Sequence, residues 1–402
     1  MENPKIRFKG FTKDWEQRKL IDYLEVSSEK NRDNRFTKDD VLSVSGEYGI
    51  VNQIEFQGRS FAGASVSNYG VVENGDVVYT KSPLKSNPYG IIKTNKGIPG
   101  IVSTLYAVYK PKEITDSKFV QIYFELDSRM NSYMHPLVNK GAKNDMKVSA
   151  ENALKGMVSF PKKDEQEMIS LYFSNLDHLI TLHQRKCEQT KNLKKYMLQK
   201  MFPQNGAKVP EIRFNGFTHD WEQRKFGSLL EETRNKTIFE DEDTLLSCAI
   251  DGMYLNSELF SHFRGSSNIG YLKVKKNDLI LSAQNLHLGN CNVNLRFEHG
   301  IISPAYKVYE LVGCNPLFMQ AWVKKDSTKD FFLKSSTEGA SVCRKNIVWE
   351  ELYKQELPVP SIDEQTKVGE YFYSLDHLIT LHQRKCDELK KMKKFMLQNM
   401  FI

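Results

Sequence analysis

Mostly apolar positions recur at alternating steps of four and three residues in two separate stretches of the chain. This spacing is typical of a helix that packs along one seam against another helix. Each stretch begins with a Pro-x-x-Asp-Glu-Gln motif, at residues 161–166 and 360–365, and acidic residues favour the first turn of a helix. No proline follows before Phe202 or Phe401, so we predict two helices of about 38 residues, or about 57 Å each at 1.5 Å per residue. The seam positions are Leu176, Ile180, His183, Cys187, Thr190, Lys194, Met197 and Met201 in the first stretch, and Leu375, Ile379, His382, Cys386, Leu389, Lys393, Met396 and Met400 in the second.

Between these stretches the hydrophobic pattern changes to short runs that are typical of β-strands. Residues 70–82 (GVVENGDVVYTKS) and residues 270–283 (GYLKVKKNDLILSA) each contain a turn followed by an apolar run. Helical stretches are expected at residues 119–134 and 316–332. The fold class is therefore expected to be mixed α/β (α+β), with two pseudo-repeated globular domains separated by two long antiparallel coiled-coil helices.

The chain is also internally repeated. The string LDHLITLHQRKC occurs at residues 176–187 and again at residues 375–386, and residues 4–20 return with few changes as residues 210–226. This is a duplicated frame and not a short-period repeat array. The expected organisation is a frame segment at residues 1–20, an insert at 21–160, a central frame segment with a long helix and a linker at 161–226, a second insert at 227–358, and a final frame helix at 359–402.

The two inserts resemble each other only at scattered points, such as GIVSTLYAVY at residues 100–109 and GIISPAYKVY at residues 300–309. A constant frame with two different inserts suits one kind of partner that meets both frames and two different ligands that meet the inserts. Faster drift of the inserts after a duplication is the plainer alternative.

Composition adds a modest electrostatic preference. The chain has 402 residues, of which 40% are hydrophobic and 27% charged, so two to three ordinary globular domains are expected. Its net charge of +7 and pI of about 8.8 lean towards an acidic partner such as nucleic acid. The cysteines lack metal-ligand spacing, so we expect no metal. With no apolar run of 18 residues and a polar beginning, a cytoplasmic protein without membrane contact is expected.

Two basic, polar loops follow the helical stretches of the inserts, at residues 138–149 and 334–347. Lys and Arg in such loops can contact phosphates, and Asn, Ser or Thr can contact base edges. The ends of two predicted strands offer further polar side chains, although a surface loop without a ligand would look similar. The candidate DNA-binding residues are Thr80, Lys81, Ser82, Lys140, Lys143, Asn144, Lys147, Gln284, Asn285, Ser336, Thr337, Arg344 and Lys345.

Familiar catalytic motifs are missing from the sequence. It contains no glycine-rich dinucleotide or phosphate loop and no nucleophile elbow, and SNPYG at residues 86–90 lacks one proline of a base-methyltransferase loop. We therefore predict no catalytic residues and no cofactor site. His183 and His382 occupy seam positions, where we expect them to be buried structural residues, and we attribute the duplicated Asp-Glu-Gln to helix capping.

Several motifs occur twice and in the same order: R-F-x-G-F-T-x-D-W-E-Q-R-K, P-x-x-D-E-Q, LDHLITLHQRK and the terminal K-x-x-M-L-Q-x-M-F. Together they resemble the specificity (S) subunit of type I restriction-modification systems, and the resemblance covers the whole chain in architecture. It implies that the inserts are two target recognition domains, each reading one half of a bipartite double-stranded DNA target. The helices would set the half-site spacing and dock methyltransferase (M) subunits, two in number, with restriction (R) subunits joining through them.

The same resemblance implies that the chain itself is noncatalytic. S-adenosylmethionine, ATP and Mg would then belong to the partner subunits. Two other functions remain open from the residues alone. One is an atypical DNA methyltransferase or nuclease with catalysis in the inserts, and the other is a scaffold that binds two different proteins.

Overall fold

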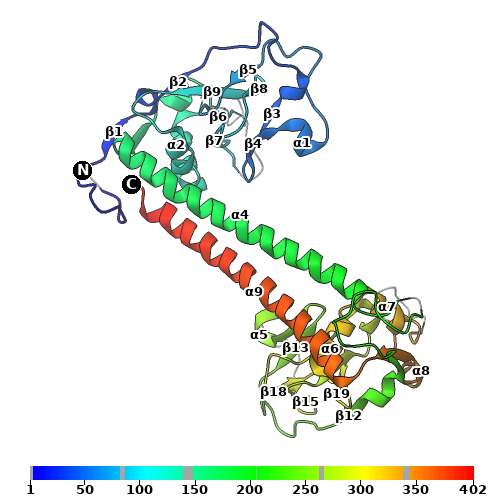
Figure 1. Ribbon diagram of the computed structural model, residues 1–402. Helices are drawn as coiled ribbons and strands as arrows, with labels where there is room; N and C mark the ends of the chain where they lie inside the picture. The colour runs from blue at the N-terminus through cyan, green and yellow to red at the C-terminus, as the bar shows by residue number, and fades with distance from the viewer. Residues whose placement is uncertain (1–2, 82–86, 139–147, 205, 262–266, 338–344) are drawn as a thin grey trace. The chain divides into compact units, whose positions relative to one another are not determined.

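The computed structural model describes the chain except for residues 1–2, 82–86, 139–147, 205, 262–266 and 338–344 (Figure 1). The chain divides into two compact units, which we call unit 1 (Met1–Leu182 with Lys385–Ile402) and unit 2 (His183–Arg384). Both boundaries fall inside the long helices α4 (Lys163–Lys200) and α9 (Ile362–Asn399). Each unit therefore contains an insert, a frame segment and part of both helices.

Unit 1 is built around a four-stranded antiparallel sheet with the order β2-β9-β6-β7. Three pairs of antiparallel strands, β1-β10, β3-β4 and β5-β8, lie outside this sheet. The strands are β1 (Glu16–Lys19), β2 (Leu24–Val26), β3 (Leu42–Ser45), β4 (Gly49–Asn52), β5 (Gly70–Val72), β6 (Val77–Thr80), β7 (Ile92–Thr94), β8 (Gly100–Val102), β9 (Tyr106–Pro111) and β10 (Met157–Phe160). The shorter helices are α1 (Gln53–Gln57), α2 (Ser117–Tyr123) and α3 (Asp127–Met134), with 3-10 turns at Leu20–Asp22, Lys38–Asp40, His135–Leu137 and Asn152–Leu154.

Unit 2 repeats this topology strand for strand, with the sheet order β12-β19-β16-β17 and the pairs β11-β20, β13-β14 and β15-β18. The strands are β11 (Glu222–Lys225), β12 (Leu230–Thr233), β13 (Leu246–Ala249), β14 (Gly252–Leu255), β15 (Leu272–Lys275), β16 (Leu279–Ser282), β17 (Cys291–Val293), β18 (His299–Ile302), β19 (Tyr306–Leu311) and β20 (Glu356–Val359). The shorter helices are α5 (Asn256–Leu259), α6 (Pro316–Val323), α7 (Asp326–Leu333) and α8 (Trp349–Lys354), with 3-10 turns at Phe226–Leu229 and Leu286–Leu288. The two divergent inserts thus have one fold.

The long helices confirm the prediction from the seam spacing, because α4 and α9 each contain 38 residues. They run antiparallel within unit 2. His183 Nδ1 lies 3.1 Å from His382 Nδ1, and further along α4 Lys194 binds Asp376, which comes earlier on α9, at 2.5 Å. The two histidines are hydrogen-bonded as expected but only half-buried. Neither helix, nor any other in the described ranges, is long and apolar enough to cross a membrane.

Each unit completes its core with the tail of a long helix. In unit 1 Phe401 packs against Trp15 and Phe119, with ring centroids 6.2 and 5.6 Å apart. In unit 2 Phe202 packs in the same way against Trp221 (5.9 Å) and Phe318 (5.5 Å). This repeated aromatic packing explains why the M-L-Q-x-M-F tail occurs twice.

Backbone hydrogen bonds fasten the same tails to the repeated opening segments. The Ile6 N–H donates to Asn399 O (3.0 Å) in unit 1, and the Ile212 N–H donates to Lys200 O (2.9 Å) in unit 2. Opening segment and helix tail are therefore joined through main-chain groups as well as through side chains.

The duplicated Asp-Glu-Gln motif lies at the start of each long helix, but its Glu does more than cap the helix. Glu165, which is 2% exposed, accepts two hydrogen bonds from Arg7, both of 2.7 Å. Glu364 (1% exposed) binds Arg213 in the same two-pronged way, at 2.7 and 2.8 Å. The motif thus ties the repeated opening segment to the long helix, which the capping interpretation did not anticipate.

The glutamine of the motif fastens the insert to the same helix start. Gln166 accepts from the Asp116 N–H (2.9 Å) and donates to Pro161 O (2.8 Å). Gln365 repeats both bonds with the Asn315 N–H (2.7 Å) and Pro360 O (2.9 Å). The spacing and order of the motif therefore serve three chain segments at once.

Breaking one of these buried ion pairs should destabilise the unit that contains it. The Arg213→Ala variant leaves the Glu364 carboxylate buried without its cation, and we expect the free energy of unfolding of unit 2 to fall by about 2–4 kcal/mol. Urea unfolding monitored by tryptophan fluorescence measures the effect. Arg18→Ala, which removes an exposed pair with Glu16, serves as the control and should leave the midpoint nearly unchanged. An equal loss in both variants would contradict this role of the pair.

Candidate nucleic-acid interface

In unit 1 two of the candidate residues lie at the end of β6. Thr80 is 3% exposed, and its hydroxyl accepts a hydrogen bond from the Ile91 N–H (2.8 Å). Lys81 follows it and donates to Thr104 O at 2.7 Å. Burial, aided by the charge of Lys30, lowers the pKa of the Lys81 amine. Thr80 is therefore a structural residue at the strand end, whereas Lys81 lies at the surface beyond it.

In unit 2 the structure brings two candidate segments together. Gln284 and Asn285 follow β16, and the Asn285 N–H donates to the Ser282 hydroxyl (3.2 Å). The Lys345 N–H donates to Gln284 O (3.2 Å), which places the loop after α7 beside this strand end. Gln284, Asn285 and Lys345 thus lie close together at the end of one strand.

Two other candidates in this loop form internal hydrogen bonds. Ser336 donates its hydroxyl to Phe332 O (2.9 Å), and Thr337 bonds Asn346 O through its N–H (2.9 Å) and its hydroxyl (3.3 Å). These bonds hold the two arms of the loop together. The remaining candidates lie outside the described residues: Ser82, Lys140, Lys143, Asn144, Lys147 and Arg344.

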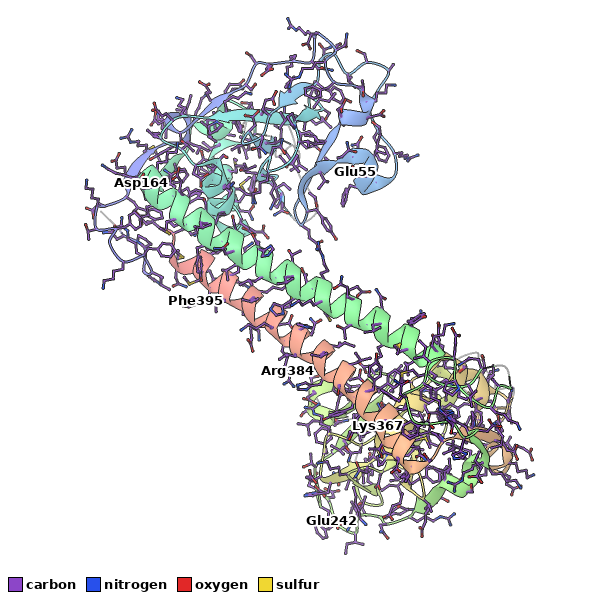
Figure 2. The ribbon with its side chains drawn as sticks, viewed as in Figure 1. Glu55, Asp164, Glu242, Lys367, Arg384 and Phe395 are labelled. Carbon is purple, nitrogen blue, oxygen red and sulfur yellow. The ribbon has the colours of Figure 1, made fainter. Side chains whose placement is uncertain are left out.

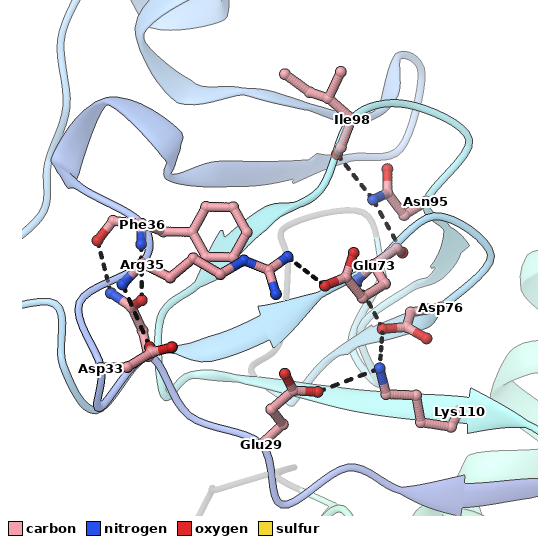
Figure 3. A network of polar contacts seen from close by, with 10 residues as sticks. Glu29, Asp33, Arg35, Phe36, Glu73, Asp76, Asn95, Ile98 and Lys110 are labelled. Atoms are coloured by element: carbon pink, nitrogen blue, oxygen red, sulfur yellow. Dashed lines mark hydrogen bonds and ion pairs between the residues drawn. The ribbon is translucent and has the colours of Figure 1, made fainter.

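A polar network that sequence reasoning missed holds the turn before β6 (Figure 3). The Glu73 N–H donates to Asp76 (2.8 Å), and Asn95 donates to Glu73 O (3.1 Å). Lys110, on the neighbouring strand β9, lies 3.2 Å from Asp76. Burial raises the pKa of Asp76, and Lys110 offsets part of this rise. The strand that leads to Lys81 is thereby fixed at its beginning. Residues 73–76 were predicted to form a turn, but their partners are distant in the sequence.

Another ion pair of Figure 3 joins Arg35 to Glu73 at 2.6 Å. Arg35 belongs to the segment after β2, and its guanidinium also stacks on the ring of Phe36, 4.6 Å from the centroid. The segment before β3 is therefore attached to the same turn.

The corresponding site of unit 2 has the turn but lacks the cation. Asp278 is 3% exposed and accepts from the Lys275 N–H (2.7 Å). The residue of β19 that corresponds to Lys110 is Glu310, which binds Lys275 at 3.3 Å. Burial, with a smaller contribution from Glu310, raises the pKa of Asp278 to about 6. The same position of the neighbouring strand thus carries a lysine in unit 1 and a glutamate in unit 2.

No protein-family model matches the chain, but its structure is similar to solved ones. It superposes on the type I restriction-modification S subunit from M. genitalium with a TM-score of 0.60 and 12% identity, covering 100% of this chain and 99% of that one. The chain has the fold of a type I S subunit. Also similar are the HsdS subunit from Thermoanaerobacter tengcongensis (TM-score 0.45, 14% identity, 96% of each chain) and a chain from a study of type I R-M complex assembly and conformational transition (TM-score 0.46, 13% identity, 96% and 97%).

The S-subunit fold confirms the architecture expected from the repeated motifs, with two long helices and two mixed helix and strand units. Within it, the described candidates fall into two groups. Thr80, Ser336 and Thr337 support the local backbone. Lys81 and Lys345 lie at equivalent strand ends of the two units, where their ammonium groups can donate to phosphate oxygens.

Neutralising Asp278 should stabilise unit 2 at neutral pH. Because its pKa in the folded chain is raised to about 6, its stabilising contribution is present below the unfolded pKa of about 3.9 and is lost as the pH rises through 6. We expect Asp278→Asn to raise the free energy of unfolding by about 1–3 kcal/mol at pH 7 and much less at pH 4. Urea unfolding at both pH values measures it. Asp76→Asn, which also removes the ion pair with Lys110, is the matched control. Burial raises the pKa of Asp76 too, but Lys110 offsets part of the rise, so the gain in unit 1 should be smaller.

Proposed function

We propose that this chain is the DNA-specificity subunit of a type I restriction-modification complex, and that each insert binds one half of a bipartite double-stranded DNA target. The observation that carries the proposal is that one S-subunit fold spans the chain while a nearly identical frame holds two different inserts. Two domains with the same topology but different surfaces are suited to binding two different half-sites of one DNA duplex. The net charge of +7 agrees with an anionic partner.

We assign the target recognition domains to residues 21–160 and 227–358, and the frame to residues 1–20, 161–226 and 359–402. The four-stranded sheet of each unit lies wholly within its insert. This supports inserts that carry their own scaffold for DNA-reading loops. The frame contributes the strands β1 and β11 and the long helices.

The repeated helices are proposed to dock methyltransferase subunits. Large apolar side chains are exposed at equivalent positions of α4 and α9, 199 residues apart, which suits one kind of partner bound twice. The exposed pairs are Leu179 and Leu378, Leu193 and Met392, and Tyr196 and Phe395. In this proposal two M subunits bind here and R subunits join through them. The chain itself is noncatalytic, and S-adenosylmethionine, ATP and Mg are bound by the partner subunits.

Exchanging one insert should change one half of the target. We expect a chain carrying the 227–358 insert of a related protein, assembled with M subunits, to methylate sites with a new half-site and the old one. If the helices set the spacing, the preferred spacer should stay the same because they are untouched. Adenine methylation of target libraries with variable half-sites and spacer lengths measures both.

The control for this experiment is the chain without M subunits, which should transfer no methyl group. Methyl transfer by the chain alone would show that it is an enzyme. A change in both half-sites would contradict independent reading, and a changed spacer would contradict the role of the helices.

Removing a phosphate contact should reduce the salt dependence of DNA binding. We expect Lys81→Gln and Lys345→Gln each to lower the slope of log K against log salt concentration by about 0.9. Lys140, Lys143 and Arg344 are predicted to behave in the same way. The assembled complex is titrated with target duplex at several salt concentrations. Lys9→Gln, an exposed lysine of the frame, is the control, and an unchanged slope in all the other variants would move the DNA surface elsewhere.

A further inference from the structure

Unit 2 contains a pocket of about 1070 Å³ that the proposed DNA-reading surfaces do not use. It lies between the last turns of α4, the turn from α6 to α7, and the first half of α9. One part of its wall is apolar and aromatic, with Leu198, Leu317, Phe372 and Tyr373. Tyr373 is 50% exposed, so its ring is accessible. Small-molecule sites typically occupy about 300–1,000 Å³ and combine such a wall with a few polar groups.

The other part of the wall is cationic. Six lysines and four carboxylates line the pocket, so its net charge is positive. Lys194 is bound by Asp376 and Lys200 by Glu211, each at 2.5 Å. These two ion pairs have no net charge, so the excess of positive charge comes from the other lysines of the wall.

The remaining carboxylates do not neutralise the remaining lysines. Asp251 accepts the Tyr254 hydroxyl (2.9 Å), and Asp326 lies 3.4 Å from Lys329, outside the pocket wall. Lys191 and Lys195 form no ion pair within the described ranges. Lysines without a carboxylate partner therefore contribute to the pocket wall.

Lys325 is the most informative of these residues, because it is only 8% exposed. Its ammonium lies 4.7 Å from the Phe202 ring centroid, and no described residue offers it a hydrogen-bond acceptor or a carboxylate. Burial lowers its pKa to about 8. Apart from this ring the ammonium is left to solvent or to a ligand. The adjacent Lys324 has two partners, since it donates to Ile250 O (2.7 Å) and Cys291 O (2.9 Å).

The start of α7 adds to the positive potential. Lys325 is the residue immediately before this helix, and its side chain does not cap the first N–H groups. A helix N-terminus favours an anion. In unit 1 the corresponding helix α3 also begins with Asp-Ser, but Leu126 takes the place of Lys325 and Glu125 that of Lys324. There Glu125 binds Lys393 at 2.5 Å, so the cationic turn belongs to unit 2.

We propose that this lysine pocket binds a small nucleoside phosphate, with the phosphates on Lys191, Lys195 and Lys325 and the base against Phe372 and Tyr373. A ligand of this class matches both halves of the wall, since phosphates form charge-assisted bonds with ammonium groups and bases stack on aromatic rings. A DNA duplex does not match it, because its backbone is too broad to reach the recessed Lys325. The proposal is independent of the DNA-specificity function.

Calorimetric titration of the full chain with ATP tests the proposal, with tripolyphosphate and duplex DNA as comparison probes. We expect saturable ATP binding that Lys325→Met and Lys195→Gln each weaken by about tenfold or more. Lys325→Met retains the length of the side chain, and Lys195→Gln covers the case in which the buried variant fails to fold. Tyr373→Ala should weaken ATP and leave tripolyphosphate unchanged.

The matched control is Lys367→Gln, an exposed lysine of α9 outside the pocket (Figure 2), which should bind ATP like the parent chain. The absence of saturable ATP binding at millimolar concentration, or an equal loss in Lys367→Gln, would refute the site. Complete displacement of ATP by duplex DNA would assign the lysines to DNA instead. Equal affinity for tripolyphosphate, unaffected by Tyr373→Ala, would refute the nucleoside part.

Discussion

The packing of a helix tail against the tryptophan of a repeated opening segment is the interaction on which the rest of the structure depends. In unit 1 Phe401 meets Trp15, and in unit 2 Phe202 meets Trp221. Around each contact, a buried Arg–Glu pair fixes the start of the other long helix of that unit. Each insert therefore contacts the tail of one long helix and the start of the other. The frame residues are constrained by both contacts. This accounts for motifs that recur almost unchanged beside inserts that do not.

Conservation of topology between the inserts leaves their electrostatics free to differ. Asp76 is paired with Lys110, while Asp278 is buried opposite the charge of Glu310. Just before α3 and α7, Glu125 in one unit is replaced by Lys324 in the other. Such exchanges alter charge without altering strand order, because the hydrogen bond from a main-chain N–H to the turn aspartate recurs in both units. One topology can thus carry two surfaces that differ in charge and therefore in the ligands they bind.

The long helices could be predicted from the sequence because each offers a seam of eight regularly spaced positions and a proline-free run. The topology of the inserts could not, since strands of three to six residues each offer only a few alternating positions. The role of Glu165 could not be predicted either, because its partner Arg7 lies 158 residues away. An acidic residue in the first turn of a helix is already explained by the helix dipole. Thr80 illustrates the same limit at the candidate interface, because a polar residue at a strand end can face solvent or support the next strand. Only the position of the Ile91 N–H distinguishes the two.

The division of the helices between the units also sets the order in which the units can fold during synthesis. Unit 2 consists of the continuous segment His183–Arg384, so its core can close as soon as that segment has left the ribosome. Unit 1 needs Lys385–Ile402, which are made after all of unit 2. Until then Trp15 and Phe119 lack the Phe401 ring that covers them, and the nascent first unit carries an open apolar core that favours association with other chains. A chain interrupted within the last turns of α9 would thus lose the unit that was translated first and keep the one that was translated second.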